Sequence, residues 1–336
     1  MKAPSPSCAR RIPQLDGLRG VAILLVVTSH ALGGVYPHDR PLFPFVGPGW
    51  GGGFVGVQLF FVLSGFLITS VLMGDRERTG RIDLLAFYGR RVRRLLPALT
   101  LACLAYAAYA LFVLPGEERA GAWGAIARAA TYTTNLDPLL PEGANSKWLN
   151  HTWSLAVEEQ FYLGWPLALV LLLRRGRRSA LAAALAGAVV AIAGRHVVSA
   201  IRPAHELMYY LMRWDALLIG CALALTPVHI RVGKITAGLG WAIMAVYLAL
   251  PPAEIRPFDY TVTSLASAAV LLSAFDSKWL ENRILGWFGM VSYGLYLWHL
   301  LLMRLDQPTW LAVATSVVVA YVSYRFIEFP ILRGKR

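Results

Sequence analysis

The chain has 336 residues, of which 57% are hydrophobic and only 15% are charged, whereas a soluble domain has about 25% charged residues. Lys and Arg number 32 and Asp and Glu number 19, which gives a net charge of +13. The 14 Phe, 14 Tyr and 11 Trp residues exclude a disordered chain, and the low charge argues against soluble domains. The composition predicts a protein that crosses a membrane several times.

About ten apolar runs are candidates for membrane helices, which need roughly 20 apolar residues, or fewer when they are buried among other helices. The runs lie near residues 18–32, 54–73, 95–114, 155–173, 180–198, 207–225, 235–250, 261–275, 285–303 and 310–326. No apolar stretch precedes Leu18, so we expect no cleavable signal peptide. The predicted fold class is an all-α, polytopic bundle of about ten transmembrane helices.

The basic residues predict the orientation of this bundle, because cytoplasmic loops retain Lys and Arg. Seven arginines lie between Arg76 and Arg94, and four more lie in RRGRR at 174–178. Both termini are therefore expected in the cytoplasm, with a tail at 1–11, a membrane domain at 12–330 and a basic tail at 331–336. Topology accounts for the high charge, so we expect membrane lipids and no nucleic acid as partners.

The cysteines predict neither a disulfide framework nor a metal site. Cys8, Cys103 and Cys221 are few and scattered, and the last two lie inside apolar runs, where they are expected as small core residues. No His or Cys spacing favours a metal.

Ionisable residues inside apolar runs are costly in a membrane and therefore mark candidate functional positions. In LDGLRGVAILLVVTSH, Arg19 and His30 are eleven residues apart. At about 100° and 1.5 Å per residue they share one helix face and lie ~16 Å apart along the axis. The alternative to a functional role is a structural one, in which Arg19 extends to the membrane surface and His30 forms a hydrogen bond with a neighbouring helix.

Two further polar features lie at the second and third runs. GWGGGFVGVQLFFVLSGFLI contains Gln58 and Ser64 among apolar residues and glycines that permit close helix contacts. FYGRRVRRLLPAL places arginines at the cytoplasmic entrance of the third run, namely Arg90, Arg91, Arg93 and Arg94. Such guanidinium groups bind phosphates, although a basic juxtamembrane run also anchors a helix against anionic lipid.

An acidic pair follows the long outer loop at 115–151. In NHTWSLAVEEQFYLGWP, we expect Ser154 to cap a helix that carries Glu158 and Glu159 in its first turns. Because adjacent residues do not share a helix face, one carboxylate is expected in the bundle interior and the other at its rim. Other ionisable residues of apolar runs, open to an ion pair or a structural polar contact, are Arg213, Asp215 and His299.

These motifs occur together in a fixed order. They are QLDGLRGVAILLVVTSH, GVQLFFVLSGFLI, YGRRVRRLLP, HTWSLAVEEQFYLGWP, RWDALLIGCALA, YGLYLWH and RFIEFP. In this order they resemble the membrane acyltransferase 3 family, over residues 12–330. The resemblance implies a multi-pass inner-membrane enzyme that transfers an acyl group, such as acetyl, to a hydroxyl of a surface polysaccharide, peptidoglycan, lipid or antibiotic.

The resemblance also implies roles for particular residues. The spacing of Arg19 and His30 matches the family's R-x10-H motif, whose histidine is regarded as catalytic, and Arg91 and Arg94 match its R-x-x-R motif. Acyl-CoA is then the donor substrate, held through its phosphates by these arginines, and no cofactor is bound permanently. His30 would either act as general base toward the acceptor hydroxyl or carry the acyl group itself.

Three further assignments complete the expected site. Glu158 is expected to orient a histidine, and Gln58 and Ser64 are expected as polar contacts near the thioester. Some members of the family carry an extra-membrane esterase-like domain, so this chain is expected to act either alone or with a separate extra-membrane acyltransferase or esterase-like partner.

Two other classes of function stay open at this point. A transporter or flippase of a small or lipid-linked substrate is the main alternative, because a bundle with buried charges also suits a permeation path. A non-catalytic scaffold for a partner enzyme is the second.

Overall fold

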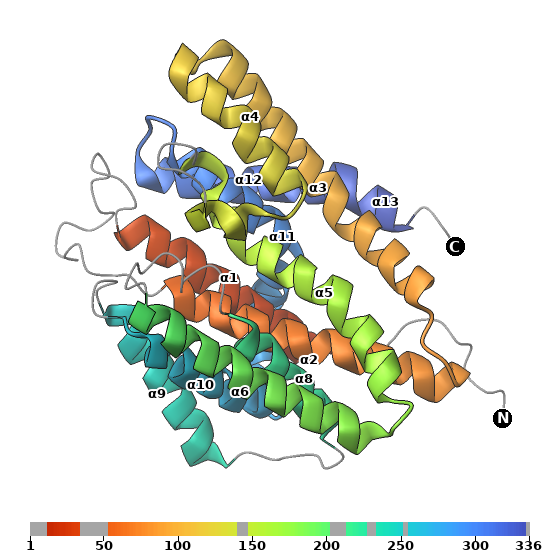
Figure 1. Ribbon diagram of the computed structural model, residues 1–336. Coiled ribbons are helices and arrows are strands. Elements are labelled where there is room, and N and C mark those ends of the chain that lie inside the picture. The colour runs from red at the N-terminus through yellow and green to blue at the C-terminus, as the bar shows by residue number, and fades with distance from the viewer. Residues whose placement is uncertain are drawn as a thin grey trace.

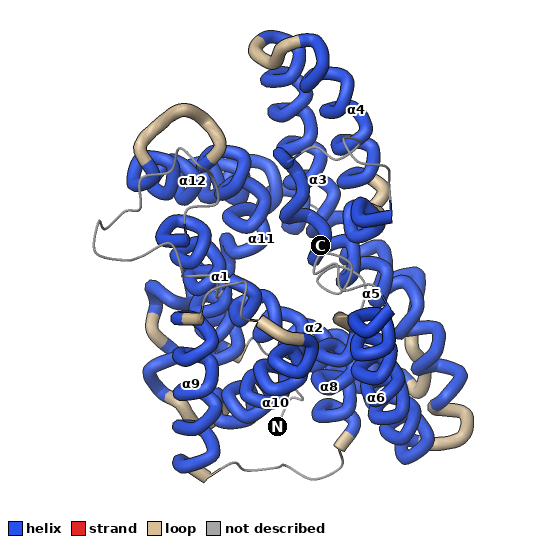
Figure 2. Tube along the Cα trace, turned by 60° about the vertical axis from the view of Figure 1, so that its left-hand side comes forward, coloured by secondary structure: helices blue, strands red, loops and turns tan. Residues whose placement is uncertain are grey.

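The computed structural model describes residues 12–33, 53–139, 147–201, 213–226, 233–250 and 255–333, and these residues contain helices and loops but no strand. Figures 1 and 2 show a bundle of long helices. The α-helices are α1 (Pro13–Gly33), α2 (Gly53–Thr79), α3 (Leu84–Phe112), α4 (Gly116–Ala130), α5 (Trp153–Leu172), α6 (Arg177–Ile201), α8 (Trp214–Leu225), α9 (Lys234–Ala249), α10 (Pro257–Ala274), α11 (Arg283–Met303), α12 (Thr309–Ser323) and α13 (Phe329–Arg333). Short 3₁₀ turns form η1 (Thr134–Leu139), η2 (Lys147–Thr152) and η4 (Lys278–Glu281), and a π-helix forms η5 (Tyr324–Glu328).

Among the described residues, 7 helices are long and apolar enough to cross a membrane. They are Pro13–Leu32, Gly53–Thr79, Leu84–Phe112, Trp148–Leu172, Arg177–Ile201, Arg283–Met303 and Thr309–Arg333. The all-helical prediction is confirmed, whereas the count of about ten spans and the cytoplasmic termini stay predictions. The difference comes from three runs: α8 and α9 are shorter, with 12 and 16 residues, and α10 carries several Ser and Thr residues.

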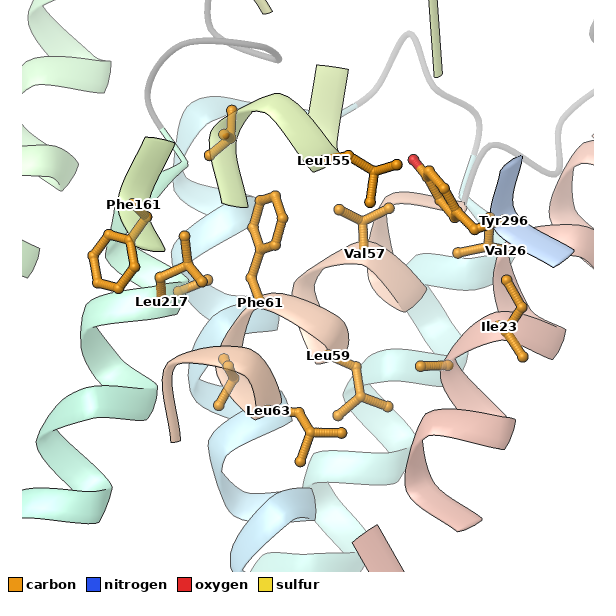
Figure 3. Packing of buried hydrophobic residues seen from close by; sticks show 14 of the residues in the cluster. Ile23, Val26, Val57, Leu59, Phe61, Leu63, Leu155, Phe161, Leu217 and Tyr296 are labelled. Atoms are coloured by element: carbon orange, nitrogen blue, oxygen red, sulfur yellow. The ribbon is translucent and has the colours of Figure 1, made fainter. Parts of the chain in front are cut away.

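Helices α1 and α2 lie in the middle of the bundle (Figure 2). α1 packs most extensively against α11, and α2 against α8. α2 is apolar on all sides, as expected for a helix enclosed by others. Figure 3 shows Val57, Phe61 and Leu63 of α2 beside Ile23 of α1 and Leu217 of α8, and all five side chains are buried.

Glycines bring α2 and α8 into backbone contact. A Cβ atom at Gly65 would lie 1.9 Å from the carbonyl oxygen of Leu217, and one at Gly220 would lie 2.0 Å from that of Val62. Small residues are the usual means of close helix approach in membranes, because dispersion contacts there replace the hydrophobic effect between helices. The glycines of the second run therefore have a packing role.

The segment at 115–151, which the sequence predicts on the outer side of the membrane and which we call the outer segment, is largely helical over its described residues 115–139 and 147–151. α4 packs against α3, and η1 and η2 follow it. The Trp148 ring lies 5.7 Å from the ring of Tyr106 and 4.8 Å from that of Tyr109, both on α3. Trp148 thus packs against a helix of the same chain.

The cysteines agree with the prediction where the structure describes them. Cys103 and Cys221 are free and buried in apolar surroundings. Cys8 lies outside the described residues.

We predict that Gly65→Ala and Gly220→Ala each destabilise the folded bundle, because an added methyl group would meet a backbone carbonyl that has no rotamer to change. Overpacking of this kind costs about 1–3 kcal/mol or more. The thermal midpoint of the detergent-solubilised protein, followed by size-exclusion chromatography after heating, measures the effect.

Gly164→Ala on the exposed face of α5 is the matched control, since nothing lies within 4 Å of a Cβ atom there. A midpoint equal to or above that of the wild type is expected for this variant. Equal midpoints for all three variants would contradict the close contact of α2 with α8.

Candidate active site

A cavity of about 300 Å³ opens between α1, α2, α3, α5 and α11. Val57, Phe61, Leu155 and Tyr296, seen in Figure 3, belong to its wall. Its charged and polar lining consists of Arg19, Arg90, Arg91, Arg94, Ser64, Ser154, Glu158, Glu159, Tyr162, Ser292, Tyr293 and Tyr296. The cavity therefore brings together five residues that the sequence predicts for the site: Arg19, Ser64, Arg91, Arg94 and Glu158.

Arg91 is held in place from two sides. It forms an ion pair with Glu159, in which Nε also lies 3.4 Å from Oε2. The guanidinium carbon lies 3.4 Å from the centre of the Tyr162 ring, a stacking geometry that favours a cation over an aromatic face. Arg91 is thus oriented and neutralised by the protein itself.

Arg19 and Arg94 differ from Arg91, because neither forms a hydrogen bond or an ion pair with a described residue. Both line the cavity, and they lie near enough for their positive charges to repel each other. Two such guanidinium groups in a partly apolar cavity have the chemistry that suits a multiply charged anion, since each presents several N–H donors in a fixed plane.

Glu158 and Glu159 both line the cavity, so the expectation that one of them lies at the rim is wrong. Glu158 faces α2 and accepts hydrogen bonds from the Ser64 hydroxyl and, at 2.7 Å, from the Tyr162 hydroxyl. Glu159 faces α3 and Arg91. The two side chains thus leave α5 toward different helices, and both belong to the cavity wall.

In the described part of the chain, Glu158 contacts hydroxyl groups and no histidine, so these contacts do not support the expected orienting role. The expected cap at Ser154 is also not found, because α5 begins at Trp153 after Thr152. The Ser154 hydroxyl instead lies 2.6 Å from the Tyr296 hydroxyl of α11. A tertiary hydrogen bond has replaced the local cap.

Gln58 lies outside the cavity lining, on the side of α2 that faces α8 and α10. Its amide oxygen accepts a hydrogen bond from Arg213, with Nε at 3.1 Å, and its amide nitrogen donates to the Tyr260 carbonyl at 2.8 Å and the Ser264 hydroxyl at 2.6 Å. Gln58 is fully buried. Its position indicates a structural polar contact away from the arginines.

Asp215 and Arg213 do not pair with each other. Asp215 receives two hydrogen bonds of 2.9 Å from Arg195 of α6, and both side chains are fully buried. Paired in this way, the two charges remove the cost of leaving either one alone inside the bundle.

His30 lies beyond the cavity, in a cluster of three histidines from separate elements. Its Nδ1 is 3.0 Å from Nε2 of His299 on α11, and the two rings are stacked with their centres 5.1 Å apart. His151 of η2 places its ring 5.5 Å from that of His299. Tyr296 joins the two regions, since it lines the cavity and its ring lies 5.5 Å from that of His299.

The arrangement of this cluster was missed by sequence reasoning. His299 carries the signal of an ionisable residue in an apolar run, but nothing in the sequence shows that it meets His30. His151 precedes a helix in what reads as a loop, and its place beside His299 depends on the folding of the outer segment. Tyr162 and Glu159 likewise gain their roles through contacts made across the bundle.

The outer segment is tied to α5 next to the acidic pair. Gln160 donates to the Tyr132 carbonyl at 2.8 Å and exchanges hydrogen bonds with the Asn135 side chain at 2.9 and 3.0 Å. Tyr132 has a left-handed backbone with φ of 53°, a conformation that is unfavourable for a bulky residue. Burial, with the nearby Glu159 carboxylate, raises the pKa of Tyr132 to about 12, so its hydroxyl stays protonated at neutral pH.

Comparison with known proteins gives a consistent result. The acyltransferase 3 model, described as an acyltransferase domain, matches residues 12–326. Peptidoglycan O-acetyltransferase OatA of Listeria monocytogenes is 30% identical, over 99% of this chain and 58% of that protein. The putative peptidoglycan O-acetyltransferase YrhL of Bacillus subtilis is 32% identical, over 96% of this chain and 55% of that protein. O-acetyltransferase OatA of Staphylococcus aureus is 29% identical, over 96% of this chain and 57% of that protein.

The chain spans about half the length of these curated relatives. No solved structure matches it. The family model nevertheless covers nearly the whole chain, in agreement with the order of the motifs. The chain belongs to the acyltransferase 3 family.

Proposed function

We propose that the chain is a membrane O-acetyltransferase that takes an acetyl group from acetyl-CoA and transfers it to a hydroxyl of peptidoglycan or a related envelope glycan. The observation that carries this proposal is the cavity in which Arg19 and Arg94 form no hydrogen bond or ion pair with a described residue. His30 lies on the same helix as Arg19, ~16 Å further along the axis. The names of the relatives favour a transferase over a transporter.

Binding of the donor follows from the charges of the cavity. Arg19 and Arg94, with Arg90 at the edge, would hold the phosphates of the CoA nucleotide, and the apolar wall would hold the pantetheine arm. Arg91 would support this site by keeping Glu159 neutralised and Tyr162 in place. We place the mouth of the cavity on the cytoplasmic side, because the basic residues of the α2–α3 connection favour that side.

His30 supplies the chemistry in this proposal. In a direct transfer, a ring nitrogen of His30 accepts the hydroxyl proton while the hydroxyl oxygen bonds to the acyl carbon. The C–S bond then breaks, and the leaving thiolate takes the proton from His30, so that the products are the acetyl ester and free CoA. If His30 carries the acyl group instead, the same lone pair attacks the thioester carbon and expels the CoA thiolate. In a second step the hydroxyl oxygen bonds to the acyl carbon and displaces His30, and the hydroxyl proton passes to the thiolate.

The acceptor class rests on the relatives that are named for peptidoglycan O-acetylation. We also propose that a separate extra-membrane acyltransferase or esterase-like protein assists the transfer onto the final acceptor. We place the enzyme in the inner (plasma) membrane.

We predict that His30→Ala lowers acetyl transfer by about 10²- to 10⁴-fold, the range expected when a general acid–base group is removed. The measurement is release of CoA by protein in nanodiscs that receives acetyl-CoA and an envelope glycan extract, with mass spectrometry of the extract. His196→Ala, at an exposed position on α6, is the control and should keep wild-type turnover. Full turnover of His30→Ala would remove His30 from the mechanism.

We also predict that Arg94→Ala weakens acetyl-CoA binding by about tenfold or more, because a hydrogen bond to a charged group contributes about 1.5–3 kcal/mol. Arg93→Ala removes a neighbouring arginine that is not part of the cavity wall, so it should leave the affinity near that of the wild type. Isothermal titration of the solubilised protein with acetyl-CoA compares the two variants. Equal affinities of the Arg94→Ala and Arg93→Ala variants would show that the overall positive charge of the region, and not the cavity wall, attracts acetyl-CoA.

A further inference from the structure

The hydrogen bonds of His299 determine which of its ring nitrogens carries a proton. Nδ1 lies 2.7 Å from the carbonyl oxygen of Tyr296 and 3.2 Å from that of Leu295. A carbonyl oxygen only accepts hydrogen bonds, so Nδ1 must be the donor. In neutral His299, Nε2 then carries a lone pair and no hydrogen.

The position of the proton on His299 determines its position on His30 through a single contact. Nε2 of His299 lies 3.0 Å from Nδ1 of His30, and one of the two atoms must supply the hydrogen. Because Nε2 of neutral His299 is an acceptor, Nδ1 of His30 is the donor. Nε2 of neutral His30 is then left with its lone pair, which is the form that a base or a nucleophile requires.

The surroundings favour neutral His299 over the charged form that would reverse this order. His299 is fully buried, and within the described residues it contacts two carbonyl oxygens and neighbouring rings, with no carboxylate among them. A buried imidazolium without a carboxylate is strongly disfavoured.

The free nitrogen of His30 faces a position without a side chain. A Cβ atom at Gly53, the first residue of α2, would lie 3.8 Å from Nε2 of His30. The same Cβ atom would lie 3.2 Å from the Ser29 hydroxyl oxygen, so glycine keeps a further side chain away from this nitrogen. The orientation of the ring thus places Nε2 beside the backbone of Gly53 and Nδ1 against His299.

We propose that His299 is a positioning residue that holds His30 in the tautomer with the lone pair on Nε2. The proposal rests on the proposed function and applies to both routes of acyl transfer, because each begins with that lone pair. When Nε2 takes the hydroxyl proton, the Nδ1–H bond to His299 stays in place and stabilises the cation. His299 thus has the orienting role that the sequence assigns to Glu158.

Two substitutions separate this role from structural support. Oε1 of Gln and Nε2 of His are both four bonds from Cα, so His299→Gln can keep an acceptor for His30. Nδ2 of Asn and Nδ1 of His are both three bonds from Cα, so His299→Asn can keep the bond to the Tyr296 carbonyl but loses the acceptor. His299→Leu loses both, and His196→Leu on α6 is the matched control for removing a histidine.

We expect acetyl transfer by His299→Gln within about tenfold of the wild type, and a loss of about 10²-fold or more for His299→Asn and His299→Leu, a range set by the loss of general base catalysis. The affinity for acetyl-CoA should be unchanged in all of them, because His299 is not part of the cavity wall. Equal losses for the Gln and Asn variants, or higher activity for Asn, would overturn the proposal in favour of structural support.

A second measurement needs no activity. In full-length protein with ¹⁵N-labelled histidine in nanodiscs, the signals that vanish in His30→Ala identify His30, and their shifts distinguish a protonated Nδ1 from a protonated Nε2. We expect protonated Nδ1 in the wild type and protonated Nε2, or a mixture, in His299→Asn. Protonated Nε2 in the wild type would overturn the proposal.

The two proposals fail in distinguishable ways. If the wild-type protein transfers no acetyl group, the proposed function fails, and the tautomer of His30 still tests the present inference. If His30→Ala is inactive but all His299 variants match the wild type, the inference fails and the proposed function stands.

Discussion

The contact between α1 and α11 is the constraint on which both parts of the site depend. A Cβ atom at Gly289 of α11 would lie 1.9 Å from the carbonyl oxygen of Asp16, and one at Gly20 of α1 would lie 2.1 Å from that of Leu285. Such backbone contact leaves little freedom for the helices to slide. It fixes the level of His30 against His299 as well as that of Arg19 against the cavity.

Some charged side chains of the bundle form ion pairs with each other, whereas others face the cavity without an ion-pair partner among the described residues. Arg195 with Asp215 and Arg91 with Glu159 are paired, and such pairs are tolerated in a membrane because each charge offsets the other. Arg19 and Arg94 have no comparable partner among the described residues, although they lie close together. A bundle that orients one guanidinium with its own carboxylate and leaves two others facing a cavity is arranged for anion binding.

Much of this architecture is accessible from the sequence, because membrane helices depend on long apolar runs and on local periodicity. The helices, the shared face of Arg19 and His30, and the arginine group at the start of α3 follow from such local patterns. Contacts between distant segments do not. Gln58 reads as a site residue but faces α8 and α10, and Glu159 reads as a rim residue but pairs with Arg91. In each case a partner more than sixty residues away decides the role.

Tyr296 connects the cavity to the histidine cluster, two regions that the proposed function treats as one site despite their separation along α1. Its side chain lines the cavity, its hydroxyl donates to the His151 carbonyl at 2.8 Å, and its own carbonyl accepts from His299. The turn of α11 from Tyr296 to His299 therefore carries both part of the cavity wall and the carbonyl that orients His299. On the proposed route, a thioester that reaches His30 from the arginines passes this turn, so the packing of the turn affects both the access of the acyl group and the tautomer that receives it.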